Sequence, residues 1–345
     1  MKYYICNTQS KSGIARYAEN IHRYILKDYG YKLIDPSCVT ELSYEHLLNG
    51  VFMFELGSNQ FSESAALNYV LKCGGRNISV TLHDPPFITF PYFHFKNKYV
   101  NKISKAFDYY LNTFGIQSRI LRLCSSVYVL SHKGATELIR RHNLNNVKVI
   151  PHLVVDVLES VEIKSLNNNI IYFGFIGPGK GIEYALQLHE EITKTIPSSV
   201  IYVVGEPINN DGKAYLSYLK RKYINNVQYL GYVNEEQLHE VFGCATHVFL
   251  PFKNYKYILP FSGSLLYGMK KGKLLWTTKV NCVDEIIEND VNGQYLSGNI
   301  IEDAEKFYNL SRNPVNVCCM IEKSIEKLIE QYNVKYVAEK IMAHY

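Results

Sequence analysis

Val248-Phe249-Leu250-Pro251 and Ser262-Gly263-Ser264-Leu265-Leu266-Tyr267-Gly268-Met269 are the two runs that decide the fold. The first is short and apolar, which predicts a strand. The second predicts a helix whose first turn consists of small residues. Backbone N–H groups at a helix start have no partner inside the helix, and they form a ready binding site for phosphate. The two runs therefore predict a strand–turn–helix unit with an anion site at the helix start.

A second turn of the same kind comes earlier in the chain, at Gly174-Phe175-Ile176-Gly177-Pro178-Gly179-Lys180-Gly181. It is rich in glycine and carries a lysine near its end. Two such turns in one half of the chain predict a diphosphate held between them, as in a nucleotide-activated substrate.

The composition is that of a globular protein with 345 residues, of which 47% are hydrophobic. This length predicts two domains. The net charge of +5 is too small and too spread out to indicate nucleic-acid binding. No run of about 18 apolar residues occurs, which argues against an integral membrane protein. The segment 1–7 turns polar too soon for a signal peptide and predicts a first strand instead.

The eight cysteines are scattered, and no pair has C-x-x-C spacing. A disulfide framework and a cysteine metal site are therefore not expected, and a reducing cytoplasm fits.

Apolar runs alternate with helical patterns along the chain, which is typical of parallel sheets covered by helices. A first helix is predicted from Gly13, and a long closing helix from Val317 with an interruption near Asn333. The polar stretch 154–169 is the best domain boundary. The predicted fold class is α/β, with two Rossmann-like doubly wound domains at 1–155 and 156–329; a C-terminal helix at about 330–345 packs back on the first. The predicted strands are 3–6, 51–55, 77–82, 126–130, 147–150, 170–176, 199–204, 227–230, 246–250 and 273–277.

In order and spacing, several segments resemble the glycosyltransferases of GT-B fold, specifically the large retaining family called group 1. In the second half the resemblance lies in Gly174-Phe175-Ile176 with Lys180-Gly181-Ile182-Glu183, Val203-Val204-Gly205, Tyr229-Leu230-Gly231-Tyr232-Val233, 266–272, Asp284-Glu285-Ile286-Ile287 and Asn292-Gly293. In the first half it lies in Gly13-Ile14-Ala15-Arg16-Tyr17, Glu55-Leu56-Gly57-Ser58-Asn59, Val80-Thr81-Leu82-His83-Asp84, 127–131 and Val149-Ile150-Pro151-His152.

The resemblance implies a metal-independent hexosyl- or glycosyltransferase without a cofactor. Its two domains would face each other across a cleft, with the acceptor on the N-terminal domain and a nucleotide-diphosphate sugar of UDP, GDP or dTDP type on the C-terminal one. The acceptor would be a hydroxyl of a glycan or lipid-linked oligosaccharide in bacterial surface polysaccharide synthesis (lipopolysaccharide or capsule), and transfer would retain the configuration. The sequence departs from the family at Leu259 and Tyr267, where two glutamates separated by seven residues normally stand.

The candidate donor contacts centre on Lys180, whose cation would offset charge building on the leaving phosphate. The alternative for Lys180 is a solvated lysine in a tight turn. Tyr267 could contact the nucleoside or fill the core, and Arg16 could contact a phosphate or pair with Glu19. The remaining candidates are glycines and serines that could equally serve as turn or cap residues, and Glu285 in a predicted helix. The full donor set is Gly13, Arg16, Gly177, Gly179, Lys180, Gly205, Ser262, Gly263, Ser264, Tyr267 and Glu285.

His83, Lys180 and Asp84 are the candidate catalytic residues, and Glu55, Asn59 and His83 the candidate acceptor contacts. The resemblance puts His83 near the reacting sugar, where its imidazole or carbonyl would support positive charge; the alternative is a histidine that satisfies a loop carbonyl. Asp84 would matter if the reaction inverts, because inversion needs a general base; otherwise it makes an Asp-Pro turn. Glu55 could equally be a buried glutamate with a structural partner.

Aromatic and basic residues are interleaved over 87–110. This mixture suits a membrane interface or a cleft for a lipid-linked diphosphate or a sugar. The alternative is an aromatic core with lysines on the solvent-exposed face. The predicted location is therefore the cytoplasm, with peripheral contact to the inner membrane face through 87–110 as an open possibility. The missing glutamates also leave open a non-catalytic GT-B scaffold that partners another transferase, and a GT-B epimerase or phosphorylase is a further rival.

Overall fold

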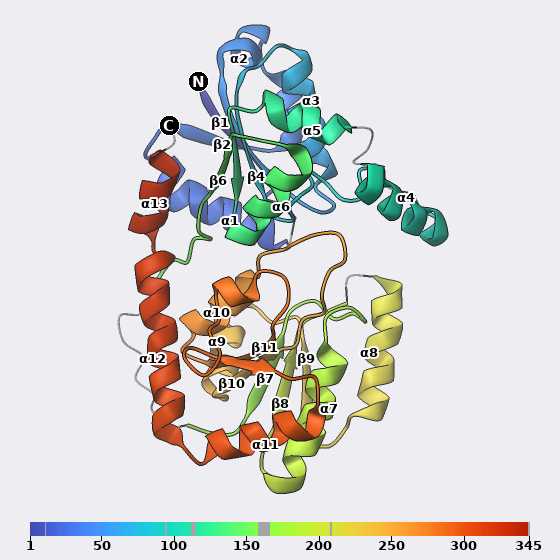
Figure 1. Ribbon diagram of the computed structural model, residues 1–345, viewed down its shortest axis with the longest axis vertical. Helices are drawn as coiled ribbons and strands as arrows, with labels where there is room; N and C mark the ends of the chain where they lie inside the picture. The colour runs from blue at the N-terminus through green and yellow to red at the C-terminus, as the bar shows by residue number, and fades with distance from the viewer. Residues whose placement is uncertain (11, 94, 112–114, 158–165, 208, 344–345) are drawn as a thin grey trace. The chain divides into compact units, whose positions relative to one another are not determined.

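The computed structural model describes residues 1–10, 12–93, 95–111, 115–157, 166–207 and 209–343. The chain divides into two compact units (Figure 1). Unit 1 comprises Met1–Val155, Tyr255–Phe261 and Gln331–Tyr345, and unit 2 comprises Asp156–Asn254 and Ser262–Glu330. Part of the predicted boundary, 158–165, lies outside the described residues.

Unit 1 contains a six-stranded parallel sheet with the strand order β2-β1-β3-β4-β5-β6. The chain adds β2 on one side of β1 and then places all later strands on the other side. The strand order of the sheet therefore reverses between β1 and β3. The strands are β1 (Lys2–Ile5), β2 (Tyr31–Ile34), β3 (Val51–Leu56), β4 (Asn77–Leu82), β5 (Ser126–Val129) and β6 (Val147–Val149).

Successive side chains of these strands alternate between two buried faces, as a strand in a covered sheet requires. Phe52 and Phe54 of β3 face one apolar core, whereas Met53 faces the other. Val337 and Ile341 of the last helix are also buried in the second core. The helices of unit 1 are α1 (Gly13–Ile21), α2 (Tyr44–Asn49), α3 (Phe61–Lys72), α4 (Lys98–Leu111), α5 (Ile116–Leu123), α6 (His132–His142) and α13 (Val334–Met342).

Unit 2 contains a second six-stranded parallel sheet, with the order β12-β11-β10-β7-β8-β9. Counted from its first strand this is 3-2-1-4-5-6, the order of dinucleotide-binding folds. The reversal lies between β7 and β10. The strands are β7 (Ile170–Phe173), β8 (Ile201–Val204), β9 (Val227–Gly231), β10 (His247–Leu250), β11 (Leu274–Thr278) and β12 (Gln294–Leu296).

The largest core of unit 2 is built around Trp276 of β11, whose ring packs against Phe249 and Phe307. All three side chains are fully buried. The helices of unit 2 are α7 (Ile182–Thr195), α8 (Asn210–Lys222), α9 (Glu235–Gly243), α10 (Gly263–Lys270), α11 (Ile300–Ser311) and α12 (Pro314–Gln331).

The predicted fold class, two doubly wound parallel-sheet domains, is confirmed. The helix predicted from Gly13 begins there, since the side chain of Ser12 accepts a hydrogen bond from the Ala15 N–H and caps it. The closing helix is interrupted where predicted: α12 ends at Gln331, and Asn333 caps α13. The prediction missed the two edge strands β2 and β12.

The segment Tyr255–Phe261 leaves unit 2 between β10 and α10 and belongs to unit 1. The Leu259 N–H donates to the Pro85 carbonyl over 2.8 Å. The Tyr257 ring lies 5.7 Å from that of Phe90, and Phe261 stacks on His152 at 6.0 Å. The sequence had assigned this segment to the C-terminal domain, because its neighbours on both sides belong there.

Candidate functional site

Each sheet has one point where the strand order reverses, and ligands of doubly wound folds bind beyond the carboxyl ends of the strands at such a point. In unit 2 the loops that follow β7 and β10 start there. They lead into the two predicted anion-binding turns, 174–181 and 262–264. In unit 1 the loops after β1 and β3 occupy the corresponding place. The predicted residues thus gather at one edge of each sheet.

The loops after β7 and β10 touch through their backbones at Gly181. This residue has a φ of 77°, and a Cβ built on it would lie 1.8 Å from the carbonyl oxygen of Pro251. Only glycine fits here, because any side chain would collide with the backbone of the other loop. Gly181 therefore sets the loop after β7 against Pro251, at the start of the loop that leads to Ser262.

The turn after β8 packs against the turn after β7 in the same way. Gly205 has a φ of 137°, and a Cβ there would lie 1.9 Å from the carbonyl oxygen of Gly174. The Gly205 N–H donates to the Gly231 carbonyl over 2.8 Å, and the Gly174 N–H donates to the Val204 carbonyl over 3.0 Å. Gly205 therefore allows the turn after β8 to pack directly against the backbone of the 174–181 turn.

Gly181→Ala is expected to destabilise the protein by about 2–3 kcal/mol or more, because the new Cβ adds a backbone collision to a left-handed φ. The midpoint of urea unfolding should fall accordingly. Gly179→Ala in the same turn is the matched control, since a Cβ there meets no atom within 4 Å. Its midpoint is expected to shift by less than about 1 kcal/mol. Equal effects of the two substitutions would contradict the contact between the two loops.

The two helices that begin at the reversal point of this sheet lack a side-chain cap. Gly181 and Ser262 are the N-cap residues of α7 and α10, and neither makes a side-chain capping hydrogen bond. By contrast, asparagine side chains cap α8, α9 and α11 of the same unit. The first N–H groups of α7 and α10 are left to be satisfied by water or by a ligand. This arrangement favours an anion at both helix starts.

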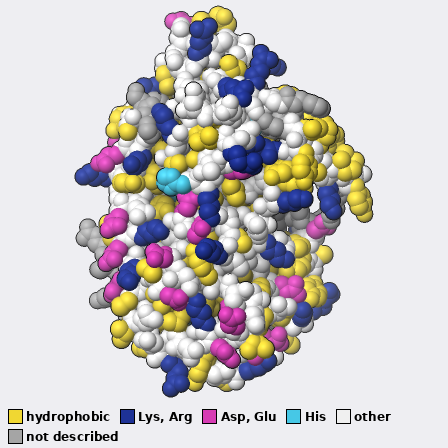
Figure 2. Space-filling model, viewed as in Figure 1, with side chains coloured by type: hydrophobic (Ala, Val, Ile, Leu, Met, Phe, Trp, Pro, Cys, Tyr) yellow, Lys and Arg dark blue, Asp and Glu magenta, His cyan; other side chains and the backbone are white. Residues whose placement is uncertain are grey.

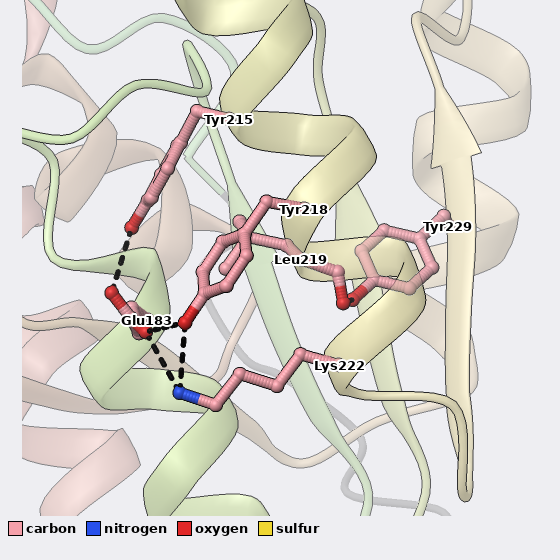
Figure 3. Close-up of polar contacts among 6 residues, drawn as sticks. All are labelled: Glu183, Tyr215, Tyr218, Leu219, Lys222 and Tyr229. Carbon is pink, nitrogen blue, oxygen red and sulfur yellow. Dashed lines mark hydrogen bonds and ion pairs between the residues drawn. The ribbon is translucent and has the colours of Figure 1, made fainter.

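Lys180 and Glu183 flank the start of α7. Lys180 is half-buried and directly precedes the N-cap. Figure 3 shows the carboxylate of Glu183, in the first turn of α7, held by three side chains of α8. Tyr218 Oη and Lys222 Nζ donate to it over 3.0 and 3.1 Å, and Tyr215 Oη over 3.5 Å.

Burial opposes ionisation of the Glu183 carboxyl, but the hydrogen bonds from Lys222 and Tyr218 outweigh it and lower its pKa below the ordinary value. The carboxylate is thereby drawn towards α8, and the first turn of α7 is fixed in position. This network holds the element that follows Lys180.

Tyr267 and Glu285 are placed less favourably for ligand contact than the turns are. The Tyr267 ring packs against Phe173 at 5.7 Å and Phe242 at 5.5 Å, which are contacts of a core residue. Glu285 lies in a three-residue 3-10 helix, Val283–Glu285, and not in the longer helix that the sequence suggested. Its carbonyl accepts a hydrogen bond from Lys327 Nζ over 2.9 Å.

In unit 1 the fully buried Glu55, in β3, joins two neighbouring strands. Tyr4 Oη of β1 donates to Glu55 Oε1 over 2.7 Å, and His83 Nε2 after β4 lies 2.6 Å from Glu55 Oε2. Because a carboxylate only accepts hydrogen bonds, the Nε2 nitrogen carries the proton. His83 is held through Nε2, which leaves Nδ1 and the backbone carbonyl as its groups for other partners.

Asp84 closes the loop after β3, since its Oδ2 accepts a hydrogen bond from the Ser58 N–H over 2.7 Å. Gly57 fits tightly beneath it: a Cβ there would lie 3.1 Å from Asp84 Oδ2 and 2.8 Å from Ile14 Cδ1. The start of α1, with Gly13, is thus brought to the same edge. Asn59 is exposed with a φ of 67°, and both Gly13 and Arg16 are exposed.

The sequence analysis missed the residues that support this edge. The Tyr17 ring lies 4.9 Å from the His83 ring and 4.8 Å from that of His152. Burial and the neighbouring His83 lower the pKa of His152 to about 4. The fully buried Glu63 accepts a hydrogen bond from the Asn7 N–H over 2.9 Å and orders the loop after β1. Tyr17 had been noted only within the segment 13–17 that resembles the family, and Glu63 carries no sequence signal of its own.

Comparison with known proteins identifies a family for part of the chain. Residues 157–314 match the family described as Glycosyl transferases group 1. This segment covers most of unit 2 and includes both glycine-bearing turns of the candidate donor site. No curated protein sequence matches the chain.

Among solved structures, HepE of Anabaena in complex with UDP-glucose is similar with a TM-score of 0.72 and 14% identity, over 99% of this chain and 98% of HepE. Sucrose-phosphate synthase of Thermosynechococcus elongatus gives a TM-score of 0.73 and 12% identity, over 99% and 97% of the two chains. TarM is similar with a TM-score of 0.65 and 17% identity over 89% of this chain. The chain spans only 57% of the length of TarM. Residues 157–314 therefore match the group 1 glycosyltransferases, and the chain has the GT-B fold.

Proposed function

We propose that this protein transfers a sugar from a nucleoside diphosphate donor to a hydroxyl group of a glycan or lipid-linked oligosaccharide, in the synthesis of a bacterial surface polysaccharide. The observation that carries the proposal is the pair of uncapped helix starts, α7 and α10, at the reversal point of the unit 2 sheet. Two phosphates joined in a diphosphate would satisfy both. The complexes of HepE with UDP and with UDP-glucose support a donor of this class.

In this proposal the donor diphosphate lies over the turn 174–181 and the start of α10. Backbone N–H groups of Gly177, Gly179 and the Ser262–Ser264 turn bind its oxygens. Lys180 offsets the negative charge that builds on the leaving phosphate as the glycosidic bond breaks. Glu285, Arg16 and Gly13 are secondary candidates for the donor.

His83 is proposed to face the anomeric carbon with its carbonyl or Nδ1, held by Glu55 through Nε2. Glu55 is therefore a positioning residue. Retention of configuration is what the family resemblance implies, and the leaving phosphate oxygen would then take the acceptor proton. Asp84 would act as a base only in an inverting reaction, and its hydrogen bond to the Ser58 N–H supports a structural role instead.

A donor panel tests the proposal. Thermal unfolding would be measured with UDP, GDP, dTDP and CMP, followed by release of nucleotide from the corresponding sugar donors. A nucleotide at a hundred times its Kd stabilises by about 2.7 kcal/mol, which raises Tm by about 2 °C or more in a protein of this size.

We expect one nucleoside diphosphate to give this shift and its sugar donor to be turned over. CMP, a monophosphate, is the internal control, because it cannot reach both helix starts. A larger shift with CMP than with any diphosphate would contradict the diphosphate site.

A further inference from the structure

Helix α4 turns the polar side chains of Ser104 and Asp108 inward, beside the Tyr109 ring. Asp108 is fully buried, and its Oδ2 accepts a hydrogen bond from the Tyr92 N–H over 2.5 Å. Ser104 Oγ donates to the Phe93 carbonyl over 2.7 Å. These bonds attach α4 to its own preceding loop through polar side chains, whereas surface helices normally attach through an apolar face.

The opposite face of α4 is apolar and open to solvent. Tyr99 is 80% exposed, Ile103 69% and Tyr110 68%. At about 100° per residue, the exposed apolar side chains occupy an arc of about 120°. Figure 2 shows hydrophobic side chains gathered over α4, with lysine or arginine side chains beside them. The stripe is formed by Tyr99, Val100, Ile103, Phe107, Tyr110 and Leu111.

The charge around this stripe has one sign. Lys96 and Lys102 are exposed and Lys105 is half-buried. The one acidic residue between 95 and 111 is Asp108, whose side chain points inward. An apolar stripe with aromatic residues and flanking lysines is complementary to the interface of a membrane that contains anionic lipids.

We infer that α4 attaches this protein to an anionic lipid surface, lying in the interface with its apolar stripe in the headgroup region. None of the helices in the described ranges has the length together with the apolar composition that crossing a lipid bilayer requires. The 14 residues of α4 extend over about 21 Å. The inference goes beyond the proposed transfer reaction and does not depend on which donor is used.

A second copy of the chain is a less suitable partner for the apolar stripe of α4 than a lipid surface. Two stripes brought together would bury the apolar residues but would also bring their lysines together, and neither stripe offers an exposed carboxylate. Anionic headgroups supply the missing negative charge, at about 1 kcal/mol for each lysine near the surface.

The test is flotation of the full chain with lipid vesicles of phosphatidylcholine, with and without phosphatidylglycerol. We expect binding to the anionic vesicles that weakens as salt is added. Ile103→Asp is expected to lower the partition coefficient at least about tenfold, because it removes an apolar anchor and adds a repelled charge. Ile103 is exposed, so the substitution leaves the core intact.

Ile301→Asp is the matched control, since Ile301 is 62% exposed on α11 of unit 2. Its vesicle binding is expected to equal that of the unsubstituted chain. Ile103→Asp should also keep the nucleotide-dependent thermal shift, which separates failure of this inference from failure of the donor proposal. Unchanged vesicle binding of Ile103→Asp would overturn the inference. So would a chain that ignores anionic vesicles but forms dimers that Ile103→Asp abolishes.

Discussion

Lys180→Ala is expected to lower kcat/KM for the preferred sugar donor by about 10²–10³-fold, the usual loss when one preorganised group is removed from a developing oxyanion. Lys180 stands directly before the N-cap of α7, next to the Gly181–Pro251 contact. Its cation therefore stands at the uncapped start of α7, on the loop that lies against the end of β10. Initial rates of nucleotide release over a range of donor concentrations would give the value.

The same substitution should remove most of the thermal shift produced by the preferred nucleotide, because the ground-state diphosphate also loses its cation. Lys213→Ala is the matched control, since Lys213 is an exposed lysine on α8 of the same unit. Neither the rate nor the shift is expected to change in this control. If Lys180→Ala behaved like Lys213→Ala, Lys180 would be a solvated turn lysine.

Stability is expected to fall steeply between pH 7 and pH 5 because three neutral histidines are buried. Burial lowers the pKa of His142 and His189 to about 4 and that of His247 to about 3. Each ring is satisfied in its neutral form. His142 Nε2 lies 2.7 Å from the Pro86 carbonyl, His189 Nε2 lies 3.1 Å from the Ser199 carbonyl, and Trp276 Nε1 donates to His247 Nδ1 over 3.2 Å.

The direction of the effect follows from the two states. In the unfolded chain a histidine has a pKa of about 6.5, so the unfolded state binds protons first as the pH falls. The contribution of these neutral histidines to the free energy of unfolding is fully present above pH 6.5. It is lost progressively as the pH falls towards 4. Each histidine lowers the free energy of unfolding by about 2 kcal/mol between pH 7 and pH 5. The three together contribute about 5–6 kcal/mol, and His152, whose pKa is also lowered to about 4, adds to this difference.

Urea unfolding at the two pH values measures this difference. His189→Gln keeps an N–H donor but cannot take up a proton, so it should reduce the difference by about 2 kcal/mol. His132→Gln, at an exposed position of α6, is the control and should leave it unchanged. Equal unfolding midpoints at pH 7 and pH 5 would contradict the buried neutral state of these rings.

Most of the fold could be predicted because its central strands are largely apolar runs. In Asn77–Leu82, which was predicted with both bounds correct, apolar residues alternate with small polar ones. The missed strands lie at sheet edges. Tyr31–Ile34 has only its first residue fully buried, and Gln294–Leu296 has three residues and begins with a glutamine. Their identity as strands comes from pairing with β1 and β11, which the local sequence does not encode.

The candidate site could be predicted as a set of residues but not as a set of contacts. Glycine-rich turns after strands indicated Gly181, yet its partner, the carbonyl of Pro251, is a backbone atom some seventy positions away in the chain. In the same way, Glu55 was a candidate by its position, whereas its bonds to Tyr4 and His83 depend on the strand order β1-β3-β4.

For 87–110 the sequence left open whether the aromatic residues form a core or face a membrane. A pattern of apolar and polar positions is the same whether the apolar side faces the core or the solvent. The outcome was decided by Ser104 and Asp108, which bond to the backbone at Phe93 and Tyr92.

The distribution of unit 1 over three separate stretches of chain has a consequence for biosynthesis. A nascent chain ending at Val155 still lacks the Leu259 N–H for the Pro85 carbonyl and the Val337 and Ile341 side chains of its second core. On the ribosome, unit 1 therefore stays incomplete until almost the whole protein has emerged. Fragments 1–155 and 156–345 should each be poorly soluble when expressed alone. Their solubility should recover when the two fragments are co-expressed.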